Sequence, residues 1–281
     1  MHTPMQDPKF DESRNPNIPA AGYRFIELRQ MAVYLLISAV GVWLLVEALI
    51  RVAPVLVSLE RERQWFGFVG EIIADEHTRP DKGLQDLADD LAQRMQLPAG
   101  SVRVYRSDKN TVNAFATFGG HIVMYQGLLD KLPDEESVAA VLAHEIAHVK
   151  HRDALRGASR SLLFTLIVSA ATGGQGNADL LIGLESLRYS RNLEEAADAA
   201  AVQAVQSRYG NVGGAVRLFH VFEQAEHEHG HSHTPQWAQS HPDTAERIRH
   251  VRAIAAQQQF PEAPSHRPNP WRNAKSSSHA P

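Results

Sequence analysis

Hydrophobic residues form one long run near the start of the chain. From Met31 to Ile50 the sequence is almost entirely apolar, with Glu47 as its only charged residue, and a helix of this length can cross a bilayer. The run is too long for the core of a signal peptide, and no small-residue cleavage site is obvious. Because core helices of soluble proteins seldom stay apolar on all faces for twenty residues, a retained membrane anchor is favoured over a buried helix.

The apolar positions that follow repeat first at helical and then at strand-like intervals. Residues recurring every three or four positions between Leu84 and Met95 predict a helix, which Pro98 ends. Gly119 and Gly120 occupy the position of a hairpin turn between two β-like runs. The runs with strand character are residues 102–105, 112–118 and 122–125.

The remainder of the pattern is helical almost to residue 258, with breaks near residues 173–176, 210–214 and 227–242. The predicted class is α+β: a transmembrane helix, then a mainly helical domain with a small antiparallel sheet. We expect four parts: a disordered tail at residues 1–22, the anchor and juxtamembrane segment at 23–58, the folded domain at 59–260 and a disordered tail at 261–281.

Composition narrows the possible functions. The 281 residues are 43% hydrophobic, which is enough for one sizeable core. A formal net charge of −4 gives no electrostatic footprint for nucleic acid, so no nucleic-acid partner is expected. The absence of Cys excludes disulfides and any zinc site built on thiolates.

The strongest chemical motif is His144-Glu145-Ile146-Ala147-His148. Residues four apart share a helix face, so His144 and His148 can present two imidazole nitrogens to one metal ion, for which zinc is the natural choice. Glu145 lies at the edge of that face, where its carboxylate can reach a water at the metal. Acidic residues after Pro133 and the apolar positions that follow indicate a helix here, although a surface helix with unrelated His residues is the alternative.

A catalytic zinc site needs a third protein ligand and one open position. The positions where a metzincin would have its Gly and third His are His151 and Ala154, so that pattern is absent. Glu194 and Asp198 are better candidates, because they lie four residues apart on one helix face. One of them can bind the metal while the other accepts a hydrogen bond from a ligating His.

Four blocks of sequence resemble peptidase family M48. In chain order they are Asn113-Ala114-Phe115-Ala116 with Gly119-Gly120, then Val141 to His148, then Tyr189-Ser190-Arg191 with Glu194 and Asp198, and finally His241-Pro242 with Glu246-Arg247-Ile248. The resemblance extends from about Leu84 to Val251, and the single anchor is similar to that of single-anchor bacterial members.

The resemblance implies a zincin-like fold and assigns roles to several residues. It makes Glu194 the third zinc ligand and Asp198 a residue that supports the ligands from behind. It suggests that Asn113, Ala114, Phe115 and Ala116 bind a peptide substrate along a strand edge, with a purely supporting hairpin as the alternative. His241 is expected near the active site, where it either gates the site or stabilises the oxyanion. Arg247 either pairs with a nearby acidic residue or lies on an exposed helix surface.

Other features have simpler interpretations. His151 lies beyond the metal-binding turn and is not expected to be a fourth ligand, because a fourth ligand would close the site. The His-rich stretch from His227 to His233 is interpreted as a polar loop, and Leu162 to Ala171 is too short to span a membrane alone.

The motifs and the M48 resemblance together predict a membrane-anchored endopeptidase with one zinc ion per subunit, Glu145 as the general base and polypeptide substrates. The resemblance alone implies that these substrates are misfolded or membrane-associated proteins. The alternative is a membrane-tethered peptide-binding or chaperone-like module with structural zinc. A bacterial inner-membrane location with a periplasmic catalytic domain is preferred over a cytoplasmic one, and basic residues on both sides of the anchor leave its orientation open. The sequence does not indicate an oligomeric state.

Overall fold

A computed structural model describes most of the chain. The described residues are 23–56, 58–67, 69–154, 156, 189–229, 237, 241, 244–265 and 267–273. The expectations for residues 1–22, for Leu162 to Ala171 and for most of the His-rich stretch lie outside them. The chain divides into two compact units, Met1–Leu49 and Ile50–Pro281.

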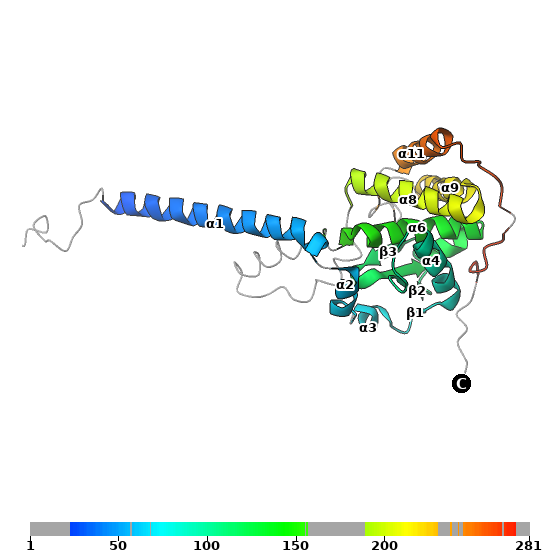
Figure 1. Cartoon of the computed structure of the whole chain (residues 1–281), viewed down its shortest axis with the longest axis horizontal. Coiled ribbons are helices and arrows are strands. Elements are labelled where there is room, and N and C mark those ends of the chain that lie inside the picture. Colours follow the sequence, from blue (N-terminus) through cyan, green and yellow to red (C-terminus); the bar gives the residue numbers. More distant parts are fainter. Residues whose placement is uncertain are drawn as a thin grey trace, which may run out of the picture. The chain divides into compact units, whose positions relative to one another are not determined.

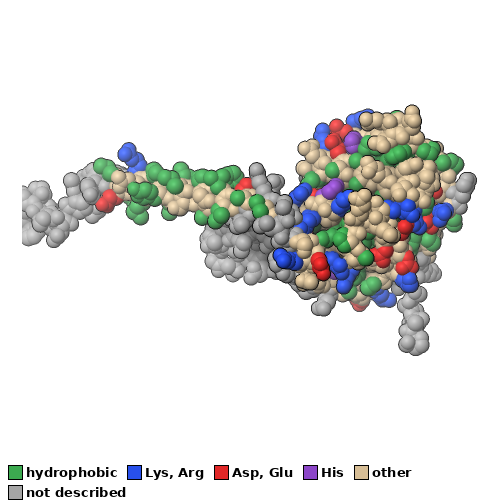
Figure 2. Space-filling view, viewed as in Figure 1, with side chains coloured by type: hydrophobic (Ala, Val, Ile, Leu, Met, Phe, Trp, Pro, Cys, Tyr) green, Lys and Arg blue, Asp and Glu red, His purple; other side chains and the backbone are tan. Residues whose placement is uncertain are grey.

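Helix α1, Tyr23–Leu56, contains the apolar run predicted to be an anchor. It is the long blue helix of Figure 1; its 20 residues from Ile26 to Leu45 have a mean hydropathy of 1.7, and apolar side chains are exposed along it (Figure 2). Twenty helical residues extend about 30 Å, the thickness of a bilayer's hydrocarbon core. The structure thus has the apolar N-terminal helix that was predicted.

The second unit contains a four-stranded sheet in the order β1-β2-β4-β3. Its strands are β1 (Thr78–Pro80), β2 (Arg103–Ser107), β3 (Ala114–Thr117) and β4 (His121–Tyr125). The β1–β2 and β3–β4 pairs are antiparallel, but β2 and β4 are parallel. The prediction of an antiparallel sheet is therefore wrong for this pair. The chain passes from β2 to the outer strand β3 first, and β4 then turns back into the space between them.

The long helices cover one face of this sheet. The long ones are α4 (Lys82–Arg94), α6 (Glu135–His151), α8 (Arg191–Tyr209), α9 (Gly213–His229) and α11 (Thr244–Gln257), and the short ones are α2 (Leu59–Trp65), α3 (Val69–Ile73) and α5 (Gln126–Lys131). Figure 1 shows α6 between the sheet and α8, and α6 contacts α8, α9, α4 and β3. The mainly helical α+β class is confirmed.

The strands alternate their side chains between two apolar clusters, as the two-residue period of a strand requires. Val104, Ile122 and Met124 join the main core with the helices, whereas Tyr105 and Val123 pack on the other face with Ile73 of α3. Helix α6 lies inside the main core and is buried from Glu136 to Val149. The sheet and the surrounding helices thereby hold this helix rigidly.

The end of the chain differs from the prediction of a tail beginning at residue 261. Asn269 donates from Nδ2 to the carbonyls of Leu129 and Leu132 at 2.8 and 2.9 Å, and Trp271 is only 9% exposed. The polar, Pro-rich composition predicted disorder, but a buried aromatic ring and several hydrogen bonds, among them those of Asn269 and Arg272, attach this segment to α5 and the turn after it.

Gly120 is required in the turn before β4. It has a φ of 77°, and a Cβ at this position would lie 2.1 Å from the carbonyl oxygen of Ser101. We expect Gly120→Ala to lower the free energy of unfolding by about 2–4 kcal/mol, because backbone strain and a clash with main-chain atoms add together. Gly210→Ala is the matched control, since Gly210 has a φ of 73° but no atom of a described residue lies within 4 Å of the added methyl group, and it should cost about 1–2 kcal/mol. Equal losses in denaturant titrations would contradict the steric argument.

Candidate metal centre

Helix α6 directs two imidazoles at one point. Asp134 caps the start of the helix by accepting a 2.8 Å hydrogen bond from the Ser137 N–H, and the acidic first turn complements the helix dipole. His144 and His148 are both buried, and their Nε2 atoms are 3.1 Å apart. The four-residue spacing therefore has the consequence expected from the sequence.

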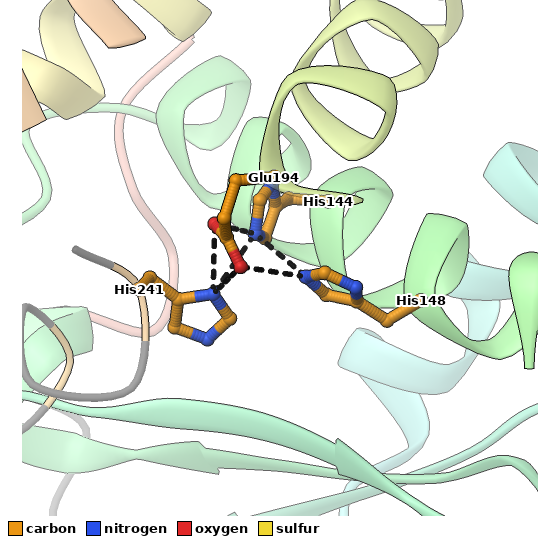
Figure 3. Close-up of side chains that lie close together, drawn as sticks. All are labelled: His144, His148, Glu194 and His241. Carbon is orange, nitrogen blue, oxygen red and sulfur yellow. Dashed lines mark hydrogen bonds and ion pairs between the residues drawn. The ribbon is translucent and has the colours of Figure 1, made fainter. Parts of the chain in front are cut away.

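Glu194 approaches the same point from helix α8. It lies in the first turn of α8 and is 1% exposed. Its Oε2 is 3.4 Å from His144 Nε2, and its Oε1 is 3.5 Å from His148 Nε2. The close-up in Figure 3 shows the carboxylate pointing toward both imidazoles. Residues that are 46 or more positions apart in sequence thus converge because α6 and α8 pack together.

His241 occupies a fourth corner of the cluster. Its Nδ1 is 3.2 Å from His144 Nε2 and 3.0 Å from Glu194 Oε1 (Figure 3). The ligand atoms of His144, His148, Glu194 and His241 all lie within 4.8 Å of one another. Tetrahedral zinc ligands at about 2.0–2.1 Å from the ion are about 3.3 Å apart. The donor types and their spacing therefore fit zinc, with His241 at the position that a catalytic site leaves open.

A carboxylate and a guanidinium support His144 from behind. Asp198 Oδ1 is 3.0 Å from His144 Nδ1, and Asp198 lies one turn after Glu194 on α8. Arg247 from α11 is 3% exposed and donates to both oxygens of Asp198 at 2.8 and 2.6 Å. Its Nη1 is also 3.1 Å from Glu194 Oε2. The structure thus agrees with the first of the two interpretations of Arg247: its side chain is buried and pairs with acidic residues.

The sequence analysis assigned no role to two residues that lie beside His148. Asp153 Oδ2 is 2.8 Å from His148 Nδ1, and both side chains are fully buried. Tyr189 stacks on the His148 ring, with centroids 4.1 Å apart and planes at 17°. Asp153 lies five residues after His148, just past the helix end, where the chain turns back through Arg152 at a φ of 61°. Helical spacing does not reveal this contact, but a carboxylate shortly after the second His was a usable signal.

The charges of the site favour a cation among its carboxylates. Burial and Arg247 lower the pKa of His144, but hydrogen bonds to Asp198 and Glu194 outweigh them and raise it to about 9. Burial raises the pKa of Glu194, yet His241, His144 and Arg247 hold it well below its usual value. Burial raises the pKa of Tyr189 well above its usual value, so its hydroxyl stays protonated.

Glu145 has an unusual environment for a buried acid. It is 0% exposed, and neither carboxylate oxygen has a hydrogen-bond partner among the described residues. The nearest ring nitrogen of His241, Nε2, is 3.7 Å from Glu145 Oε1 and also lacks a hydrogen-bond partner in that part of the chain. Because burying an unpartnered carboxylate is costly, this arrangement fits a group that receives a proton during a reaction.

The predicted substrate strand lies at an edge of the sheet. β3 pairs with β4 on one side, and no described strand pairs with its other side. Asn113, just before β3, is completely buried, and its amide atoms have no partner among the described residues. Ala114 and Ala116 face the core, and Phe115 is partly exposed on the opposite face. Among the described residues, β3 is thus an edge strand with a strand partner on one side only.

His151 lies outside the cluster. It is partly buried near the end of α6, and it is not among the four residues whose ligand atoms converge. The fourth donor comes instead from His241, which is remote in sequence.

Comparisons with known proteins agree with this geometry. The sequence model described as "Peptidase family M48" matches residues 78–255. Metalloendopeptidase OMA1 of Bos taurus is 29% identical over 165 residues, which cover 53% of this chain and 32% of that protein. Metalloprotease YcaL of Escherichia coli is 27% identical over 192 residues, covering 65% of this chain and 73% of that protein. Protease HtpX of Legionella pneumophila is 36% identical over 118 residues, covering 40% and 38%. The chain thus spans about a third of the length of OMA1 and about three quarters of YcaL.

Proposed function

The chain belongs to peptidase family M48, and from this premise we propose that it is a membrane-anchored zinc metalloendopeptidase. The observation that carries the proposal is the buried cluster of His144, His148, Glu194 and His241 beside the unpartnered carboxylate of Glu145. A peptidase needs a metal site and a proton acceptor that is not itself a ligand, and this cluster contains both.

The side chains of the site divide the work of peptide hydrolysis. His144, His148 and Glu194 would hold one zinc ion, which supplies Lewis-acid catalysis when it is bound. Glu145 takes a proton from the attacking water and passes it to the leaving amine. Asp198 and Asp153 each accept from the outer nitrogen of one ligating His, which fixes the ring orientation and keeps the inner nitrogen available.

His241 is proposed to gate the site. Its Nδ1 lies 3.2 Å from His144 Nε2 and 3.0 Å from Glu194 Oε1, so in this arrangement His241 would hold the metal ion together with the three other residues. Movement of His241 away from the cluster would make room for the attacking water. The alternative role, stabilisation of the oxyanion, requires that His241 donates a hydrogen bond to substrate instead.

The free edge of β3 is proposed to bind the substrate as an added strand. Strand addition satisfies the unpaired main-chain groups of Ala114 to Ala116 and lays the peptide beside α6, which contacts β3. A peptide in which alternate backbone amides are N-methylated should be cleaved with a raised KM, whereas an unchanged KM would contradict strand addition.

The substrates are proposed to be misfolded or membrane-associated proteins, because the anchor α1 would keep the domain at a bilayer surface. On the face shown in Figure 2, acidic and basic side chains are interspersed, which gives no reason to propose a nucleic-acid partner. A chaperone-like module with structural zinc is not favoured, because structural sites have no use for an unpartnered carboxylate next to the metal.

The location is proposed to be the bacterial inner membrane, with the catalytic domain in the periplasm. The similarity to proteases from bacteria, among them HtpX and YcaL, supports the proposal that this chain is a bacterial membrane protease. Protease added to intact spheroplasts should degrade the domain, and degradation only after lysis would place it in the cytoplasm.

The central prediction concerns Glu145. Glu145→Gln should reduce cleavage of an unfolded protein by about 10²–10⁴-fold, because the proton acceptor is lost. Zinc content should remain at one per chain, since no ligand is removed, whereas His148→Ala should lose zinc and activity together. The measurements are chelator-sensitive proteolysis and zinc analysis of the purified full-length chain. Undiminished cleavage by Glu145→Gln would reject the mechanism.

A second prediction separates the two roles of His241. His241→Ala should retain zinc, because His144, His148 and Glu194 remain, and peptide cleavage should increase when the fourth corner is vacated. The measurement is the initial rate of cleavage by variant and wild type at equal zinc content. A decrease in kcat with zinc retained would instead support oxyanion stabilisation and contradict gating.

A further inference from the structure

A buried carboxylate connects the first helix after the anchor to both halves of the site. Glu62 on α2 is 4% exposed. Its Oε2 accepts hydrogen bonds from Nε and Nη2 of Arg152 at 2.8 and 2.5 Å, and its Oε1 accepts from the Gly119 N–H at 3.2 Å. We call these three residues the Glu62 latch. Both guanidinium donors share one carboxylate oxygen, and such charge-assisted hydrogen bonds are stronger than those between neutral groups.

One end of the latch, Arg152, lies at the end of helix α6, which carries His144 and His148. Arg152 caps the C-terminus of α6 with a φ of 61°, a conformation that side chains other than Gly and Asn rarely adopt. The next residue, Asp153, has its Oδ2 2.8 Å from His148 Nδ1. Because Arg152 and Asp153 are consecutive, the ion pair with Glu62 also fixes the main chain from which Asp153 reaches His148.

The other end of the latch holds the end of the substrate strand. Gly119 belongs to the 3₁₀ turn η2, Phe118–Gly120, which directly follows β3. Phe66, at the end of α2, stacks on Phe118 with ring centroids 4.7 Å apart and planes at 20°. Helix α2 therefore fixes this turn through a hydrogen bond and a ring contact, and with it the C-terminal end of β3.

We propose that Glu62 is a positioning residue, through which docking of the juxtamembrane helix α2 sets the geometry of the active site. The inference rests on the proposed function but concerns a segment outside residues 78–255, the part that matches the family. Since α2 begins three residues after α1 ends, the piece of chain nearest the anchor is part of the catalytic architecture. Loss of the latch should loosen Asp153 behind His148 and the turn at the end of β3 together.

The test uses the full-length chain in detergent with the variants Glu62→Gln and Arg152→Gln. Glu62→Gln keeps the shape of the side chain and an acceptor for Gly119, but it loses the ion pair. Each variant should bind zinc about tenfold more weakly in chelator competition, raise the KM for a peptide substrate, or do both. The double variant should be no worse than the single ones, because both remove the same contact. Asp153→Asn is the positive control for loss of zinc affinity.

The matched control is Glu60→Gln, an exposed acidic residue on the same helix, which should leave zinc affinity and KM unchanged. Thermal unfolding identifies variants that are simply unfolded, and Arg152→Lys, which keeps the positive charge, replaces Arg152→Gln in that event. If the folded latch variants retain wild-type zinc affinity and KM, the latch is merely structural and the proposal is overturned. Zinc affinity is measured without proteolysis, so unchanged zinc affinity in the latch variants says nothing against the peptidase function. That function is tested separately, by comparing Glu145→Gln with the wild type.

Discussion

The structure depends on holding two imidazoles of one helix in fixed orientations inside a closed core. His144 and His148 are buried, so each ring needs a partner for the nitrogen that points away from the metal. Asp198 provides it for His144 and Asp153 for His148, at 3.0 and 2.8 Å. These two needs explain why α8 must pack along α6 and why the chain turns sharply just after α6 ends. Packing and chemistry therefore impose the same arrangement of helices.

The parts of the site that follow a local period could be predicted from the sequence. The spacing of four between His144 and His148, and again between Glu194 and Asp198, places each pair on one helix face whatever the rest of the fold does. The apolar N-terminal helix and the class of the domain were predictable for a similar reason, because the length and period of an apolar run indicate the element that it forms. The M48 resemblance was also confirmed, since the family match covers most of the domain.

Contacts made across turns were not predictable in this way. Asp153 reaches His148 only because Arg152 takes a left-handed conformation. Arg residues seldom adopt this conformation, so the sequence does not indicate it. The parallel pairing of β2 with β4 depends on the order in which strands enter the sheet, and the hairpin pattern of β3 and β4 does not specify it. The attachment of residues 267–273 rests on the buried ring of Trp271 and on hydrogen bonds to residues more than 130 positions earlier in the chain, and neither changes a prediction of disorder that is made from composition alone.

The balance of buried charge gives an independent reason to expect a divalent ion. Three carboxylates, those of Glu145, Glu194 and Asp198, are buried around the cluster with only one buried guanidinium among the described residues there, that of Arg247. Asp153 is a separate case, because Arg156 lies 3.5 Å from it. Such an excess of two negative charges is expensive in a core unless a cation offsets it. A proton on His144, whose pKa is raised to about 9, relieves only part of the excess. A doubly charged cation would offset all of it, so the buried carboxylates favour a divalent ion in this cluster.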